Sequence, residues 1–154
     1  MSNRPSRNTV ASIRRRAWVQ ALPLAGFSFA VRAQDPEQQA VRVPLQQYIK
    51  GHETGDGATM RKAFLPTAHI EGIRSGKFTS WTVDEYCSRF TGKPPADNAS
   101  WKRTIDHVQV FGDAAMARVT LAGPKTTATD FFVLLKADGE WKIANKVYAF
   151  KPLK

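Results

Sequence analysis

The chain has 154 residues, and its hydrophobic content of 42% is enough to build the core of one domain. It has no run of the roughly 18 apolar residues that a membrane-spanning helix needs, and its single cysteine excludes an intrachain disulfide. The net charge is +10, but residues 1–33 contribute six arginines and no acid, and residues 34–154 hold 17 Lys and Arg against 13 Asp and Glu. No basic stripe interleaved with aromatic residues remains, so we do not expect nucleic-acid binding.

Residues 1–33 have the order of an export signal. Arg14, Arg15 and Arg16 precede a moderately apolar stretch, and Val31-Arg32-Ala33 places small or modest residues at the −3 and −1 positions of a peptidase site. The arginine pair before Ala-Trp-Val resembles a bacterial twin-arginine signal. We predict cleavage after Ala33, which makes residues 34–154 a periplasmic or secreted domain without a membrane span. The alternative is a disordered basic extension on a cytoplasmic protein.

The first helix is expected to begin at Asp35, with Pro36 at the first helical position and Gln38 closing a capping box. Four residues then recur at helical spacing: Val41, Leu45, Tyr48 and His52. Pro44 removes one backbone hydrogen bond, so we expect a kink there. Gly51 and Gly55 are expected to end the helix.

Two shorter helices and one strand follow. Asp56 can cap a helix that contains Met60, and Thr82 with Glu85 forms a capping box that opens a helix with Cys87 as a small apolar residue. Between these helices, residues 68–73 alternate between apolar and polar, which predicts a first strand that ends at a turn.

From residue 100 onward the hydrophobic period changes to two. Four strands are predicted: 101–111, 114–122, 126–136 and 141–150. Asp138-Gly139 is expected to be the two-residue turn of the last hairpin. Helical pieces followed by long antiparallel strands predict an α+β fold.

The last hairpin permits a prediction of register. With a two-residue turn, Leu135 faces Lys142 and Leu134 faces Ile143, and the pairs continue as Phe132 with Asn145 and Asp130 with Val147. Both faces of the hairpin are largely apolar. Helices can cover one face, and we expect a second copy of the chain to cover the other, giving a homodimer through the sheet.

Residues 40–148 resemble the nuclear-transport-factor-two-like superfamily, also described as SnoaL-like or cystatin-like, and within it the bacterial putative lumazine-binding family. The resemblance is carried most by Gly112-Asp113-Ala114-Ala115 and by the block TDFFVLLKADGEWKIANKVY at 129–148. Weaker matches are Tyr48-Ile49-Lys50-Gly51, Gly55-Asp56, Ala63-Phe64, Pro66, Ala68, Gly76-Lys77 and Trp81.

The resemblance implies a cone-shaped domain in which N-terminal helices pack on a curved antiparallel sheet and enclose a pocket. It also implies dimerisation through the sheet. It implies no particular reaction, because the superfamily includes ketosteroid isomerases, scytalone dehydratases, polyketide cyclases and noncatalytic binding proteins.

Pocket enzymes of this fold need a base and a hydrogen-bond donor beside an apolar wall. Asp130 or His69 is the candidate base, His52 is the second imidazole candidate, and Tyr48 is the candidate donor. Candidate ligand contacts come from aromatic walls and from the hairpin face that holds Asp130. They are Trp81, Tyr86, Trp101, Phe132, Ile143 and Asn145.

A structural role is the alternative for each candidate. Asp130 can pair with Lys146, Tyr48 can be a core residue, and His69 and His107 can face solvent. His52, His69 and His107 have no paired spacing and there is no cysteine cluster, so we expect no metal and no cofactor.

Three functions stay open at this point. The first is a noncatalytic pocket for a small apolar or aromatic molecule. The second is an isomerase, dehydratase or cyclase that works without metal, in the manner of ketosteroid isomerase. The third is a dimerisation or interaction module with a vestigial pocket.

Overall fold

The computed structural model of the chain describes residues 36–152. The expected leader at residues 1–33 and the expected cap at Asp35 lie outside this range, so both stay predictions. Within the described range, no helix is long and apolar enough to cross a membrane.

The helices come mainly from the N-terminal part of the described chain. They are α1 (Pro36–Ala40), α2 (Arg42–Thr54), α3 (Gly57–Arg61) and α4 (Val83–Cys87), with a 3-10 turn η1 (Asn98–Ser100). The expected kink is an interruption at Val41 between α1 and α2. Pro44 explains its place, because proline has no N–H to donate to the carbonyl four residues earlier, that of Ala40.

The predicted helix caps are confirmed at Gly55, Asp56 and Thr82, but the expectation that Gly51 also ends a helix is wrong. Helix α2 runs through Gly51 and ends at Gly55, whose φ of 71° is left-handed and therefore suits glycine. The Asp56 side chain accepts from the backbone N–H groups of the first turn of α3. Thr82 and Glu85 form the predicted capping box of α4.

Six strands form one open sheet. They are β1 (His69–Arg74), β2 (Lys77–Thr82), β3 (Lys102–Phe111), β4 (Ala114–Ala122), β5 (Thr126–Ala137) and β6 (Glu140–Pro152), in the order β2-β1-β6-β5-β4-β3. All neighbours are antiparallel except β1 and β6, which are parallel. The predicted α+β class is confirmed, whereas β2 was not predicted as a strand. It pairs with β1 through a turn in which Ser75 and Gly76 have positive φ.

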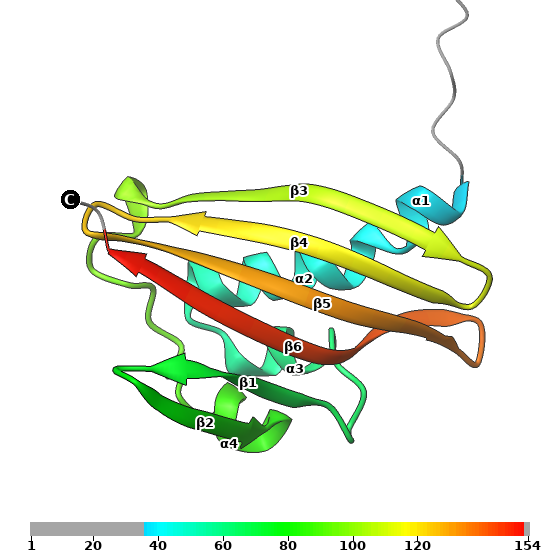
Figure 1. Cartoon of the computed structure of the whole chain (residues 1–154), viewed down its shortest axis with the longest axis horizontal. Helices are drawn as coiled ribbons and strands as arrows, with labels where there is room; N and C mark the ends of the chain where they lie inside the picture. The colour runs from blue at the N-terminus through cyan, green and yellow to red at the C-terminus, as the bar shows by residue number, and fades with distance from the viewer. Residues whose placement is uncertain (1–35, 153–154) are drawn as a thin grey trace, which may run out of the picture. The chain divides into compact units, whose positions relative to one another are not determined.

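The helices cover one face of the curved sheet, as Figure 1 shows. The core lies between the helices and the sheet. The helical side contributes Val41, which directly precedes α2, and Leu45 and Tyr48 of α2. The sheet contributes Phe132 and Leu134 of β5 and Ile143 of β6. The opposite face carries exposed apolar side chains that include Phe131, Val133 and Val147. We call the first the inner face and the second the outer face.

The register of the last hairpin is as predicted only next to its turn. Leu135 pairs with Lys142 and Leu134 with Ile143, but a β-bulge at Ala144 shifts every later pair by one residue. The predicted pairs of Phe132 with Asn145 and of Asp130 with Val147 are therefore wrong. Phe132 pairs with Lys146, and Asp130 pairs with Tyr148.

The bulge decides which β6 side chains reach the inner face. Because side chains alternate along a strand, a shift of one residue exchanges the two faces. Lys146 and Tyr148 are buried on the inner face, and Val147 is 47% exposed on the outer face.

Candidate functional site

A cavity of about 110 Å³ lies between α2, α4 and the inner face of the sheet. Its wall is mainly aromatic and is formed by Tyr48, Trp81, Tyr86, Trp101, Tyr148 and Phe150. Its charged or titratable lining residues are His52, Arg74, Arg89, Asp130 and Lys146. An apolar wall with a few converging polar groups is the usual composition of a small-molecule site.

A buried polar network forms the floor of this cavity. The Tyr48 hydroxyl donates to Oδ2 of Asp130 at 2.6 Å, and the Lys146 ammonium donates to Oδ1 of Asp130 at 3.3 Å. Lys146 also donates to the hydroxyls of Tyr48 at 3.0 Å and Tyr86 at 3.2 Å. Asp130 is 1% exposed and Lys146 is 3% exposed, so the ion pair is removed from water.

Three elements position this network. Tyr48 comes from the buried side of α2, Asp130 from the inward residues of β5, and Lys146 from β6 just past the bulge. The Lys146 nitrogen lies 4.9 Å from the ring centre of Tyr48, 4.7 Å from that of Tyr86 and 5.4 Å from that of Tyr148. These rings stabilise the ammonium through their negative faces.

The network keeps Tyr48 neutral and Lys146 charged. Burial, together with the charge of Asp130, raises the pKa of Tyr48 well above its usual value of 10.0. Burial alone would lower the pKa of Lys146, but its interactions with Tyr86 and Asp130 raise it. An ammonium has three N–H donors, and all three have partners. Lys146 therefore supplies positive charge to the cavity and is not a free amine nucleophile.

His52 is a neutral imidazole beside this network. Burial, then the charges of Arg103 and Lys146, lowers the pKa of His52 to about 4. The ring packs against Phe90 and Trp101 with centres 5.8 and 6.1 Å away. Its Nδ1 is buried and has no hydrogen-bond partner among the described residues.

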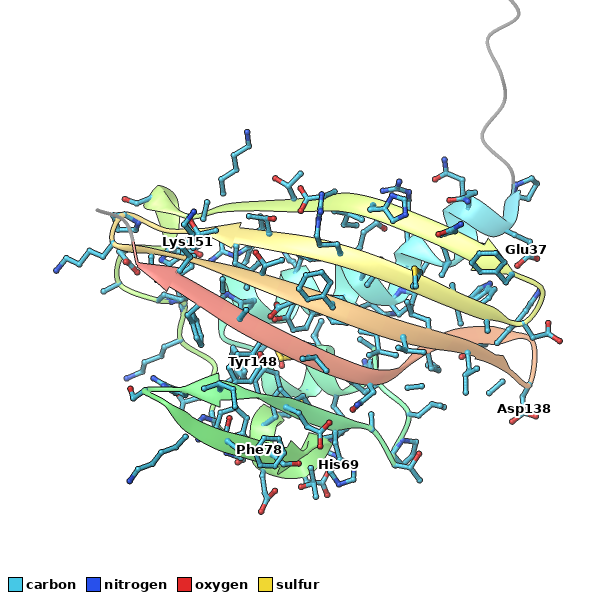
Figure 2. The ribbon with its side chains drawn as sticks, viewed as in Figure 1. Glu37, His69, Phe78, Asp138, Tyr148 and Lys151 are labelled. Atoms are coloured by element: carbon cyan, nitrogen blue, oxygen red, sulfur yellow. The ribbon has the colours of Figure 1, made fainter. Side chains whose placement is uncertain are left out.

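Stacked rings form the wall on the β1–β2 side. Trp81 and Tyr148 stack with centres 5.8 Å apart and planes 8° apart, and the guanidinium of Arg89 lies 4.9 Å from the Trp81 ring centre. Gly72 permits this packing, because a Cβ at that position would lie 2.7 Å from the Tyr148 ring. Tyr148 is labelled on β6 in Figure 2.

The structure brings together six of the predicted site residues, which all line the cavity: Tyr48, His52, Trp81, Tyr86, Trp101 and Asp130. Phe132 and Ile143 do not line it and are buried in the core, where Phe132 meets the edge of the Tyr48 ring with centres 5.1 Å apart. The roles of the cavity-lining residues in ligand contact and catalysis stay proposals.

Two predicted residues lie elsewhere. His69 is exposed at the start of β1, where its Nδ1 lies 3.1 Å from the Thr67 carbonyl oxygen, and Figure 2 shows it apart from Tyr148. Asn145 accepts from the His69 backbone N–H at 3.0 Å and donates to Glu71 at 3.3 Å. The expectation that these side chains face the cavity is wrong, for His69 because of its strand parity and for Asn145 because of the bulge.

Lys146 is the main residue that sequence reasoning did not place in the site. Its pairing with Asp130, the alternative considered for that carboxylate, is confirmed. Arg74, Arg89, Tyr148 and Phe150 were also not predicted in the cavity wall. A buried lysine on an inner face gives no signal in the hydrophobic pattern, because lysine reads as an outward residue.

A second hollow of about 300 Å³ lies on the outer face, between Met116, Phe131, Val133 and Val147. It is larger, but its described lining holds no buried ion pair and consists mainly of half-exposed apolar side chains, with His107, Arg118 and Asn145 beside them. Among the described residues, no group of three or more His, Cys, Asp or Glu could hold a metal ion. The inner cavity is therefore the candidate site.

Comparisons with known proteins agree with this geometry. The model of the family described as Putative lumazine-binding matches residues 36–149. A protein named Aldolase FrzH, from Cladobotryum sp, is 25% identical over 118 residues, which cover 75% of this chain and 93% of that protein.

Two solved structures have the same fold. An NTF2-like protein of unknown function from Shewanella baltica OS155 is 29% identical with a TM-score of 0.68, covering 76% of this chain and 95% of that chain. An NTF2-like protein from Methylobacillus flagellatus KT is 27% identical with a TM-score of 0.67, covering 79% and 97%.

Proposed function

The chain belongs to the Putative lumazine-binding family, and we propose that its domain binds a small aromatic molecule in the inner cavity. The molecule has no large aliphatic part. The observation that carries the proposal is the aromatic wall around a satisfied polar floor. The rings of Trp81 and Tyr148 form a flat wall of the cavity. At its floor, the positive charge of Lys146 is neutralised by the carboxylate of Asp130. A cavity of about 110 Å³ is below the usual range of ligand pockets, so it suits a single ring better than a steroid-sized skeleton.

Thermal unfolding with a panel of one-ring, two-ring and steroid-like compounds tests this proposal. A compound present at 100 times its Kd stabilises the folded state by about 2.7 kcal/mol, which raises the Tm by several degrees. Ala128 is 5% exposed and lines the cavity, so Ala128→Leu should fill it and abolish the shift. Ala114→Leu, on the exposed side of β4, is the matched control and should keep the shift. If no compound stabilises the parent more than Ala128→Leu, the domain is better explained as an interaction module.

A catalytic role is the second candidate. It is favoured by the neutral imidazole of His52 beside the Tyr48 hydroxyl and Asp130, and by the likeness to Aldolase FrzH. In such a site Asp130 or His52 would accept a proton, and Tyr48 would have to exchange its hydrogen bond to Asp130 for one to a developing oxyanion. Both carboxylate oxygens of Asp130 already accept hydrogen bonds, which favours His52. Proton NMR of the compound after incubation separates the two functions, because a binding protein returns it unchanged, whereas an isomerase changes its spectrum even at constant mass.

We also propose that the domain acts as a homodimer joined through the outer face. The supporting feature is the set of large apolar side chains that are 42–68% exposed there: Ile73, Phe78, Phe111, Met116, Phe131, Val133, Leu135 and Val147. Exposed apolar patches of this kind usually mark an interface. In a two-fold dimer the same surface of both copies forms the interface, so each copy would cover the apolar face of the other.

Export completes the proposal. It is supported by the order of Arg14–Arg16, the apolar stretch and Val31–Ala33 in the sequence. N-terminal sequencing of the protein recovered from the periplasm of a bacterial host should begin at Gln34. Protein that stays in the cytoplasm with its first residues intact would contradict export.

A further inference from the structure

Three buried polar atoms without a partner among the described residues belong to neighbouring side chains at one corner of the inner cavity. They are Nδ1 of His52, Nε1 of Trp101 and Nε of Arg103. The His52 and Trp101 rings have centres 6.1 Å apart, and the Arg103 guanidinium carbon lies 6.0 Å from the Trp101 ring centre. His52 and Trp101 line the cavity, so a bound molecule lies next to this corner. Arg103 is not a lining residue, and its Nη2 donates to Oδ1 of Asn98 at 2.7 Å, so Nε is the Arg103 atom without a partner.

The unpartnered atoms specify the kind of group that fits. The indole N–H of Trp101 and the guanidinium N–H of Arg103 can only donate a hydrogen bond. A neutral imidazole has one donor and one acceptor. Burying donors without a partner is unfavourable, so the corner selects an acceptor, and the positive charge of Arg103 selects a negatively charged one.

The polar groups at the floor of the cavity need no hydrogen bond from a ligand. Lys146 has three hydrogen-bond partners, and Asp130 accepts from Tyr48 and Lys146 at its two oxygens. The polar network is therefore satisfied without a ligand, whereas the His52–Trp101–Arg103 corner is not.

The charges around the cavity are mainly positive. Arg74, Arg89 and Lys146 line it together with Asp130, which is the only acidic lining residue within 36–152 and is paired with Lys146. Arg74 and Arg89 form no ion pair with the acidic residues in the described part of the chain. An anion in the corner would also offset the repulsion by Arg103 and Lys146 that helps to keep the pKa of His52 at about 4.

We propose that the ligand is an aromatic carboxylate, or an aromatic anion of the same shape, whose oxygens accept hydrogen bonds from Trp101 and Arg103 beside His52. The ring then lies along the wall of Trp81, Tyr86 and Tyr148. This inference rests on the proposed binding function and specifies the ligand class of that same cavity.

The test compares 2-naphthoate and benzoate with 2-naphthamide and benzamide, which have the same shapes without the charge. Binding is measured by calorimetry with the full chain at constant ionic strength. We expect each carboxylate to bind about tenfold tighter than its amide, because a charged acceptor strengthens hydrogen bonds from the corner.

Three variants locate the effect. Arg103→Gln should bring the carboxylate-to-amide ratio close to one. Trp101→Phe keeps a ring and loses the N–H, so it should weaken carboxylate binding several-fold and amide binding less, because a neutral carbonyl accepts a weaker hydrogen bond. Arg118→Gln, an arginine half-exposed on the outer face, is the matched control and should bind as the parent does. Circular dichroism and the Tm establish that each variant is folded.

The outcomes separate this inference from the proposal that it extends. If amides bind as tightly as carboxylates, the ligand class is wrong and the binding function stands. If carboxylates bind tighter but Arg103→Gln and Trp101→Phe do not change the ratio, the location is wrong. If neither class binds the parent, and the wider panel also fails, both proposals are overturned.

Discussion

Lys146 and Asp130 form a buried ion pair, and the stability of the fold depends on the presence of both charges. Each is almost fully buried, and each would be an uncompensated charge if its partner were removed. The hydroxyls of Tyr48 and Tyr86 supply the remaining hydrogen bonds, so the charges are solvated by the protein in place of water.

Removing one member of the pair should therefore be more damaging than removing both. Lys146→Met leaves Asp130 buried without its cation and should lower the free energy of unfolding by about 3–5 kcal/mol. Lys146→Met combined with Asp130→Asn should recover part of that loss. Urea unfolding of the parent, both single variants and the double variant measures the coupling. A double variant that loses at least the sum of the single losses would contradict the pairing.

The free energy of unfolding at alkaline pH provides a second test with the same variants. The pKa values of Tyr48 and Lys146 are both raised in the folded state. The stability that they contribute is fully present below about pH 10 and is lost as the pH rises through the raised values. The free energy of unfolding should fall more steeply above pH 10 in the parent than in the double variant, which lacks the ammonium.

At the scale of elements, one bulge determines the chemistry of the floor. Strand β6 follows the regular register from its turn only as far as Ile143, and the extra residue Ala144 then turns Lys146 and Tyr148 inward. Without the bulge, Asn145 and Val147 would have occupied those places beside Phe132 and Asp130. An amide and a valine there would leave the Asp130 carboxylate without a cation.

This explains which parts of the fold could be predicted from the sequence. The caps at Asp56 and Thr82, the Asp138-Gly139 turn and the inward Asp130 follow from local spacing, and the structure confirms them. A bulge depends on how two strands twist against their neighbours, and an alternating pattern gives no sign of it.

The same limit applies to β1 and β2. The segment 68–73 alternates as expected, but its pairing with β6 is parallel and comes from residues more than 70 positions away. Tertiary pairing of this kind decides which side of the strand faces the core, and it placed His69 outside the cavity. His52, by contrast, lies one turn after Tyr48 on α2, so helical spacing alone brings both to the cavity.

At the scale of the whole molecule, the domain has two apolar sheet faces and helices for one of them. Strand β5 shows this most clearly, because Phe132 and Leu134 are buried while Phe131, Val133 and Leu135 are 51%, 53% and 42% exposed. Full burial of a side chain such as valine or leucine is worth about 1.5–3 kcal/mol, so covering this face with a second copy would contribute substantially to the stability of the dimer.

A charge at the centre of the outer face should therefore prevent dimerisation. Val133→Glu would place two like charges opposite each other in a two-fold interface and would require both to lose water. Val43→Glu is the matched control, because Val43 is 49% exposed on α2, on the helix side of the domain and away from the outer face. Sedimentation equilibrium should give about 2 chains per particle for the parent and for Val43→Glu, and 1 for Val133→Glu. A monomeric parent, or a Val133→Glu variant that still dimerises, would contradict an interface on the outer face. Because Val133 points away from the inner cavity, the monomeric variant should still bind the aromatic ligand, which separates assembly from binding.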